Sequence, residues 1–213
     1  MAKDKIDKKN APRIYNIEDI VAVMNKKGYQ IEDKSFKPNI VGIRSLSAEP
    51  NKFDDHIALF YSDKEGFIAY HLFEATTDPG LYYLENPMRV EGTAILCEGQ
   101  YLDAYKIDLH NGKYRALCQR LGAVKVYRDP NRDNLFDMDP KKAQTGYFGI
   151  NIHHAGLDSI QVDKWSAGCQ VLKRLEDFNS LMAVCEKSAR LNGNVFSYTL
   201  LNEKDFDEED KKL

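Results

Sequence analysis

The chain has 213 residues, 43% of them hydrophobic and 11% aromatic, which excludes a disordered chain and fits one globular domain with a small appendage. A net charge of −3 and a pI of about 6.0 exclude the strongly basic surface that is typical of nucleic-acid binding. Since no apolar run reaches the roughly 18 residues of a membrane span, we expect no nucleic-acid partner and no membrane span.

The N-terminal segment and the cysteines bear on where the protein works. The first ten residues are mostly charged and lack the apolar stretch of a secretory signal, so the default expectation is a cytoplasmic protein. Without such a signal we expect reduced thiols, and their wide spacing without a Cys-x-x-Cys pair argues against a disulfide framework and a zinc site. The thiols belong to Cys97, Cys118, Cys169 and Cys185. We expect no cofactor and no metal.

One amphipathic helix follows the N-terminal arm. Asn16 has the side chain of a helix cap, and Gly28 is typical of the position just after a helix end. Between them, apolar residues recur at the spacing of one helix face: Ile17, Ile20, Val21 and Met24. Residues 1–37 are therefore predicted to form an arm and a short helix.

Residues 38–202 are predicted to form the main domain, and most of its elements are strands. Apolar runs bounded by turn residues predict strands over 40–43, 57–61, 67–76, 92–98, 104–109, 124–127 and 195–201. The segment Thr77–Gly80 predicts a type II turn, and residues 113–119 fit a strand or a short helix.

The end of the chain is predicted to hold a second long helix and a tail. Apolar residues recur with helical period over 173–191, with Cys185 on the apolar face, and residues 203–213 form a charged tail. Strands in the middle with helices towards both ends predict a mainly β class, a β-rich α+β domain with peripheral helices.

A polar loop over 129–140 partly resembles a calcium-binding loop. Asp129, Asn131 and Asp133 stand at its first, third and fifth positions. The glycine and the bidentate glutamate of such loops are missing, so we interpret this segment as a polar loop with Asx turns.

The segment from Gly146 to Leu172 holds the residues that are best suited to chemistry. Its two adjacent histidines precede a Ser-Ala-Gly-Cys turn that ends at Cys169. Because a nearby base makes a thiol nucleophilic, a histidine shortly before a glycine-flanked cysteine predicts a nucleophile and its base. If both histidines lie in one strand, the side chains of His153 and His154 point to opposite faces, because neighbouring side chains of a strand alternate.

The turn before Cys169 favours catalysis for two reasons. Small residues let the backbone approach a substrate closely. The backbone N–H groups of Gly168 and Cys169 are natural donors to an oxyanion that forms on the attacked carbonyl.

The same segment resembles the catalytic segment of the L,D-transpeptidase (YkuD-like) family. That family has a histidine at the end of a strand, a loop, and a Ser/Thr-His-Gly-Cys turn followed by an apolar residue and Asn or Arg. The matching residues are His153, Ser166, Gly168 and Cys169. The resemblance implies that Cys169 is the nucleophile, that His153 is its base, and that the fold is a β-sandwich with peripheral helices.

Three features depart from the family pattern. Ala167 replaces the histidine between the serine and the glycine, and the loop from His153 to Ser166 is slightly short. Gln170 and the two residues after it replace the usual apolar-Asn/Arg ending, which bears on substrate recognition. The Trp-Ser-Ala-Gly-Cys-Gln motif therefore resembles a divergent branch of the family, of the kind found in phage-associated or uncharacterised bacterial proteins.

The resemblance implies acyl transfer on peptidoglycan stem peptides. The Cys169 thiolate would attack the carbonyl of an L,D peptide bond and form a thioester, which an amine resolves in an L,D-transpeptidase and water in an L,D-peptidase. Candidate residues for the substrate wall are His154, Asn151, Trp165, Gln170 and Tyr147. A phage-encoded enzyme released to the cell wall would act there without a signal peptide.

Two other interpretations stay open. A domain of the same fold without activity would bind wall fragments or serve as a phage structural or assembly protein. A metal site made of His153, His154 and Cys169 is disfavoured, because adjacent histidines on a strand diverge. The sequence places none of the remaining histidines near the site: His56, His71 and His110.

Overall fold

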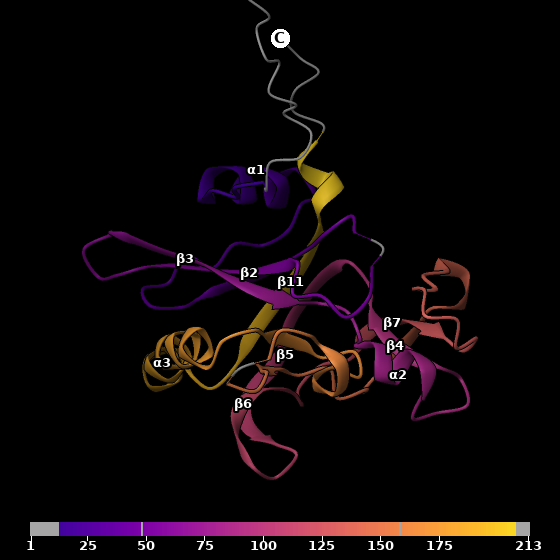
Figure 1. The fold of residues 1–213 in the computed structure, drawn as a ribbon. Helices are drawn as coiled ribbons and strands as arrows, with labels where there is room; N and C mark the ends of the chain where they lie inside the picture. The colour runs from indigo at the N-terminus through magenta and orange to yellow at the C-terminus, as the bar shows by residue number, and fades with distance from the viewer. Residues whose placement is uncertain (1–12, 48, 158, 208–213) are drawn as a thin grey trace, which may run out of the picture.

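The computed structural model describes residues 13–47, 49–157 and 159–207, and its main feature is a mixed sheet that closes into a barrel (Figure 1). In order around the barrel the strands are β1 (Asn39–Arg44), β11 (Phe196–Asn202), β5 (Gly99–His110), β6 (Tyr114–Gln119), β9 (Ile152–His154), β10 (Gln170–Leu172), β3 (Ile68–Thr76) and β2 (Asp55–Ser62). The expected mainly β, β-rich α+β class is confirmed, and the expected sandwich takes the form of a closed barrel.

The pairing of β9 with β10 positions the segment with the histidines and the cysteine. The two strands run parallel, with Ile152 beside Gln170 and His153 beside Val171. Parallel neighbours need a crossover connection, and residues 155–169 supply it. The chain therefore returns to the start of β9 just where Cys169 precedes β10.

A second, smaller sheet lies beside the barrel. It consists of the antiparallel strands β4 (Thr93–Leu96), β7 (Val124–Asp129) and β8 (Gln144–Gly146). Buried and exposed side chains alternate along its middle strand: Val124 and Val126 are buried in the main core, whereas Lys125 is exposed. In the polar loop after β7, the Asn131 amide lies 3.0 Å from the carboxylates of both Asp133 and Asp137, so these acidic groups bond within the loop.

Helix α1 (Ile17–Lys26) covers an outer face of the barrel. It begins as predicted, since the Asn16 side chain accepts a hydrogen bond from the Asp19 N–H at 2.8 Å. Its apolar face packs on outward side chains of β1 and β2, in a cluster that includes Ile20, Val23, Met24, Val41, Ile43, Ala58 and Phe60. Each fully buried apolar side chain contributes about 1.5–3 kcal/mol, which holds the helix on the barrel.

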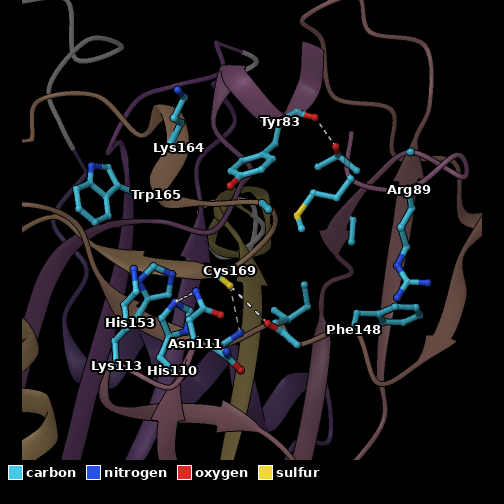
Figure 2. Close-up of a pocket in the computed structure, with 18 of the residues that line it drawn as sticks. Tyr83, Arg89, His110, Asn111, Lys113, Phe148, His153, Lys164, Trp165 and Cys169 are labelled. Carbon is cyan, nitrogen blue, oxygen red and sulfur yellow. Dashed lines mark hydrogen bonds between the residues drawn. The ribbon is translucent and has the colours of Figure 1, made fainter. Parts of the chain in front are cut away.

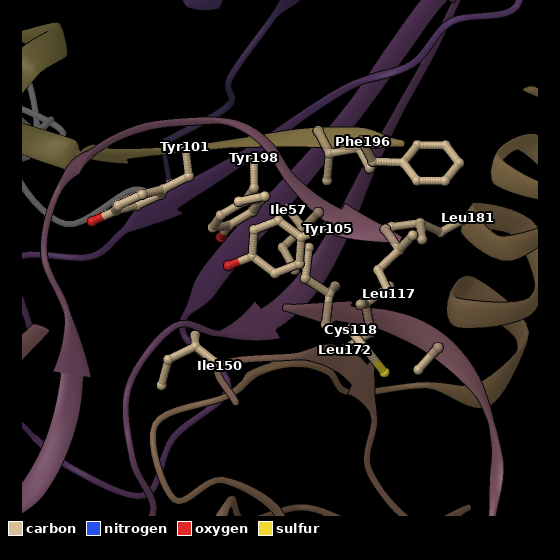
Figure 3. Packing of buried hydrophobic residues seen from close by; sticks show 14 of the residues in the cluster. Ile57, Tyr101, Tyr105, Leu117, Cys118, Ile150, Leu172, Leu181, Phe196 and Tyr198 are labelled. Carbon is tan, nitrogen blue, oxygen red and sulfur yellow. The ribbon is translucent and has the colours of Figure 1, made fainter. Parts of the chain in front are cut away.

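Helix α3 (Leu175–Asn192) begins shortly after β10 and packs against β9 and β10. Its apolar face joins the interior cluster of the barrel through Phe178, Leu181, Met182 and Cys185. Figure 3 shows Leu181 facing the strands that carry Phe196 and Leu117. No helix in the described part of the chain is both long and apolar enough to cross a membrane.

Two local predictions need correction. Gly80 has a φ of −75°, whereas a type II turn requires a positive φ there, and the chain enters the short helix α2 (Leu81–Glu85) instead. The predicted charged tail is ordered at its start, where Asn202 caps the 3-10 turn η4 (Glu203–Phe206) and Phe206 is buried. Residues 1–12 of the predicted arm and 208–213 of the tail lie outside the described residues.

Candidate active site

A cavity of about 830 Å³ opens between the barrel and the small sheet. One wall carries side chains of β4, β7 and the loop between α2 and β4, and the opposite wall carries those of the turn between β5 and β6. Residues 148–151, the turn at Cys169 and four further side chains also line it: Arg120, His153, Lys164 and Trp165. Figure 2 shows His110 and His153 on one side of Cys169, and Phe148 and Arg89 on the other.

The turn that presents Cys169 is fixed by its own serine and glycine. The buried Ser166 hydroxyl accepts from the Gly168 N–H at 3.1 Å and donates to the Cys169 carbonyl at 2.8 Å. Gly168 has a φ of 115°, and a Cβ there would lie 2.2 Å from the Ala94 carbonyl oxygen of β4. The small residues of this turn were predicted to let a substrate approach the backbone. At Gly168 it is strand β4 that approaches the backbone, whereas Ala167 lines the cavity.

The Cys169 thiol is held by backbone groups at the edge of the cavity. Its Sγ accepts from the Asn151 N–H at 3.4 Å and donates to the Gly149 carbonyl at 3.5 Å. Burial raises the pKa of Cys169 to about 11, and the Asn151 N–H acts in the opposite direction. The resting group at neutral pH is therefore a thiol, with one donor in place for the thiolate.

His153 lines the same cavity as a neutral imidazole with a defined tautomer. Its Nδ1 lies 3.0 Å from the His154 carbonyl, and because a carbonyl only accepts, Nδ1 carries the proton. The lone pair is therefore on Nε2. Burial, followed by the charge of His110, lowers the pKa of His153 to about 3.

His110, the last residue of β5, also belongs to this site, although the sequence gives it no role. Its ring stacks on that of His153, with centroids 4.1 Å apart and planes 27° from parallel. The Asn151 Oδ1 accepts from the Gln119 N–H at 2.9 Å, so its Nδ2 donates to the His110 Nδ1 at 3.0 Å. Asn151 thus contacts the Cys169 thiol through its backbone and His110 through its side chain. A histidine where a strand meets an Asn-Gly turn is the one local signal in the sequence.

The structure narrows the choice of oxyanion donors. The Gly168 N–H is occupied by Ser166, and the Gln170 N–H donates to the Asn151 carbonyl at 2.9 Å. Among the described residues, no acceptor bonds the N–H of Cys169. The same holds for the N–H of Ala167, so the open donors of this turn are those of Ala167 and Cys169 and not that of Gly168.

Of the five candidate wall residues, Asn151 and Trp165 line the cavity. The His154 ring packs between the rings of Tyr114 and Phe178, whose centroids are 4.7 and 4.9 Å away. Neighbouring side chains of a strand point to opposite faces, so His154 points away from the face that carries His153. It does not line the cavity.

The two other candidate wall residues also lie outside the cavity. Tyr147 is 63% exposed, and its hydroxyl donates to the Leu121 carbonyl at 3.2 Å, outside the cavity. Gln170 is fully buried, and its amide bonds the Thr77 carbonyl at 3.3 Å and the Tyr198 hydroxyl at 2.8 Å. The departure from the family pattern at Gln170 therefore lies in the packed interior and not on the wall.

No group of three His, Cys, Asp or Glu side chains in the described residues is arranged to hold a metal ion. The cavity is nonetheless rich in positive charge, and no local sequence pattern indicates it, because the arginines and lysines that supply the charge are scattered along the chain. We compared the chain with protein-family models, with curated proteins and with solved structures, and none of them matches it.

Proposed function

We propose that the protein catalyses cysteine-dependent acyl transfer on peptidoglycan stem peptides, with Cys169 as nucleophile and His153 as base. The observation that carries this proposal is that both side chains line one cavity, while a hydrogen bond at Nδ1 leaves the basic Nε2 of His153 available. The substrate class comes from the resemblance of the His153–Cys169 segment to the L,D-transpeptidase family.

The first step starts from a neutral pair. Since burial raises the pKa of Cys169 and lowers that of His153, the proton leaves Sγ only as sulfur attacks the substrate. The S–C bond forms, the proton passes to Nε2 of His153, and the carbonyl electron pair moves to oxygen. The Cys169 N–H stabilises that oxyanion, and the Asn151 N–H stabilises negative charge on sulfur.

The second step releases the amine and resolves the thioester. The C–N bond breaks, and the leaving amine takes the proton from His153. An incoming amine or water then attacks the thioester carbonyl, His153 accepts its proton, and the C–S bond breaks. The Cys169 thiol is restored, and the product is a transferred or a hydrolysed peptide.

A second candidate function is a wall-binding or phage structural or assembly protein without activity. The raised pKa of the Cys169 thiol favours this alternative, because many catalytic cysteines are activated by a depressed pKa. In that case the cavity would bind a wall fragment and leave its bonds intact.

A turnover assay tests the proposal. Purified protein is incubated with a disaccharide tetrapeptide, and mass spectrometry follows the loss of the terminal residue, dimer formation and a thioester on the intact protein. We expect the Cys169→Ala variant to lose turnover by about a thousandfold or more. We expect His153→Gln to lose about 10²–10⁴-fold.

The matched control is Cys97→Ala, which removes a buried thiol outside the cavity and should keep wild-type turnover. Turnover that survives in the Cys169→Ala variant would contradict the proposal. Binding of the tetrapeptide without turnover by the wild-type protein would support the wall-binding alternative.

A further inference from the structure

The charge of the cavity differs in sign from that of the whole chain. The chain has 33 acidic and 30 basic residues, whereas the described residues that line the cavity include five cationic side chains and no acidic one. The five are Arg89, Lys113, Arg120, Arg128 and Lys164. The same number of residues taken at random from the chain would include about three acidic residues, so the lining of the cavity is enriched in positive charge.

Some of these cations already have partners in the protein. Arg120 forms an ion pair with Asp108 at 3.4 Å, and the Lys164 ammonium lies 4.4 Å from the centre of the Tyr82 ring. Lys113 stands at the outer turn between β5 and β6. The cations on the other side of the cavity are placed differently.

Arg128 is held in position by neutral groups. It donates to the Gln144 side-chain oxygen at 3.0 Å and to the Gly92 carbonyl at 3.1 Å, and its guanidinium lies 4.8 Å from the centre of the Phe148 ring. A guanidinium has five N–H donors, so Arg128 keeps donors free for a ligand. Burial lowers the pKa of Arg128, and the charges of Glu91 and Arg89 act on that pKa in opposite directions.

Arg89 completes this side of the cavity. Its side chain is exposed, and among the described residues no carboxylate forms an ion pair with Arg89 or Arg128. Figure 2 shows Arg89 beside Phe148, across the cavity from His153. Among the described residues, Arg89 and Arg128 thus line the cavity without an ion-pair partner, and Glu91 acts on Arg128 only from beyond ion-pair distance.

The strand register brings this end close to the nucleophile. Arg128 of β7 pairs directly with Ala94 of β4. The carbonyl of Ala94 in turn is the group on which the Cys169 turn packs through Gly168. The backbone of Arg128 is therefore connected to the Cys169 turn through Ala94, and Arg128 and Cys169 line the same cavity.

We propose that Arg89 and Arg128 bind a free carboxylate of the acyl donor, so that the site prefers acidic stem peptides to those in which that carboxylate is amidated. This inference rests on the proposed function. A guanidinium fork matches a carboxylate in a bidentate geometry, and Phe148 holds the plane of Arg128 in place. A primary amide has one acceptor oxygen, and its own N–H groups would face the N–H groups of the guanidinium.

Matched peptides test the inference. Two synthetic stem peptides differ only in one carboxylate, which is free in one and a primary amide in the other, and the comparison is repeated for each carboxylate of the peptide. Calorimetry on the Cys169→Ala protein measures binding without turnover, and kcat/KM is measured on the unaltered protein. We expect the free acid at one position to bind about tenfold tighter or more, and the preference to fall with added salt.

Variants locate the preference. We expect Arg89→Gln and Arg128→Gln each to reduce it several-fold, whereas Lys125→Gln keeps it, because Lys125 lies on the same strand as Arg128 but outside the cavity. Arg89 is exposed, so its variant tests the inference even if Arg128→Gln fails to fold.

Three outcomes separate the inference from the proposed function. Equal binding of acid and amide at every position overturns the inference, whatever the turnover. A preference that survives in Arg89→Gln and in folded Arg128→Gln overturns the assignment to these residues. A preference that both variants reduce, without turnover by the unaltered protein, supports the inference and contradicts the proposed function.

Discussion

One buried arginine and two arginines of the cavity have opposite surroundings in this protein. Arg44 of β1 is 2% exposed and forms ion pairs with Asp78 at 2.9 Å and Glu98 at 3.2 Å. Arg89 and Arg128 face the cavity, and in the described part of the chain neither has an acidic partner within ion-pair distance.

This difference in surroundings indicates a different role for each charge. A buried guanidinium needs fixed partners, and the chain supplies them around Arg44, where the Thr77 carbonyl also accepts from it at 3.0 Å. Of the arginines in the cavity, Arg128 is held in place by neutral groups and Arg89 lies exposed, so a ligand can supply the negative charge to these two. The Arg44 cluster therefore serves the fold, and the cavity arginines are available for binding.

The largest expected effect comes from breaking the Arg44 cluster. Replacement of Arg44 by Gln leaves the carboxylates of Asp78 and Glu98 without their cation in a buried place, so we expect the free energy of unfolding to fall by about 3–5 kcal/mol. Urea denaturation followed by circular dichroism measures it. A loss below about 1 kcal/mol would contradict the role given to this cluster.

The second prediction concerns the pH dependence of stability at His153. Its pKa in the folded protein is about 3, below the ordinary value of about 6.5, so between these values the unfolded chain binds a proton that the folded protein does not. Stability is therefore lost as pH falls through this window. The contribution of His153 to the decrease in unfolding free energy from pH 7 to pH 5 is about 2 kcal/mol.

Comparison of variants isolates this contribution. His153→Gln should show a decrease from pH 7 to pH 5 that is smaller than that of the wild type by this amount. Cys169→Ala, from the same cavity, should keep the wild-type pH dependence, because the Cys169 thiol titrates far above the window. Equal slopes for wild type and His153→Gln would show that the imidazole is not held neutral by burial.

The parts of the fold with local signals could be predicted from the sequence. The Asn16 cap, the apolar face of α3 and the strands β2 and β3 depend on residues close together in the chain, and all are present. The Gly80 turn was wrong, because its sequence fits both a turn and the start of a helix.

The candidate site was predictable only where its residues lie close in sequence. His153, Asn151 and Cys169 share one segment and line one cavity. His110 and Arg128 come from other strands, and only barrel closure and strand register bring them there. The direction of the Gln170 side chain could not be predicted, because its short strand is buried throughout and shows no alternation of buried and exposed residues.

The smallest expected effect completes the comparison between the buried arginine and the two arginines of the cavity. Arg89 is as charged as Arg44, but it is exposed, so Arg89→Gln should change the free energy of unfolding by less than about 0.5 kcal/mol. The same urea titration as for Arg44→Gln measures it, and the two variants make the same chemical change at different sites. If Arg89→Gln destabilised the protein as strongly as Arg44→Gln, its guanidinium would have to be part of the folded framework. Near-equal stability with altered peptide binding would instead assign the charge of Arg89 to the ligand.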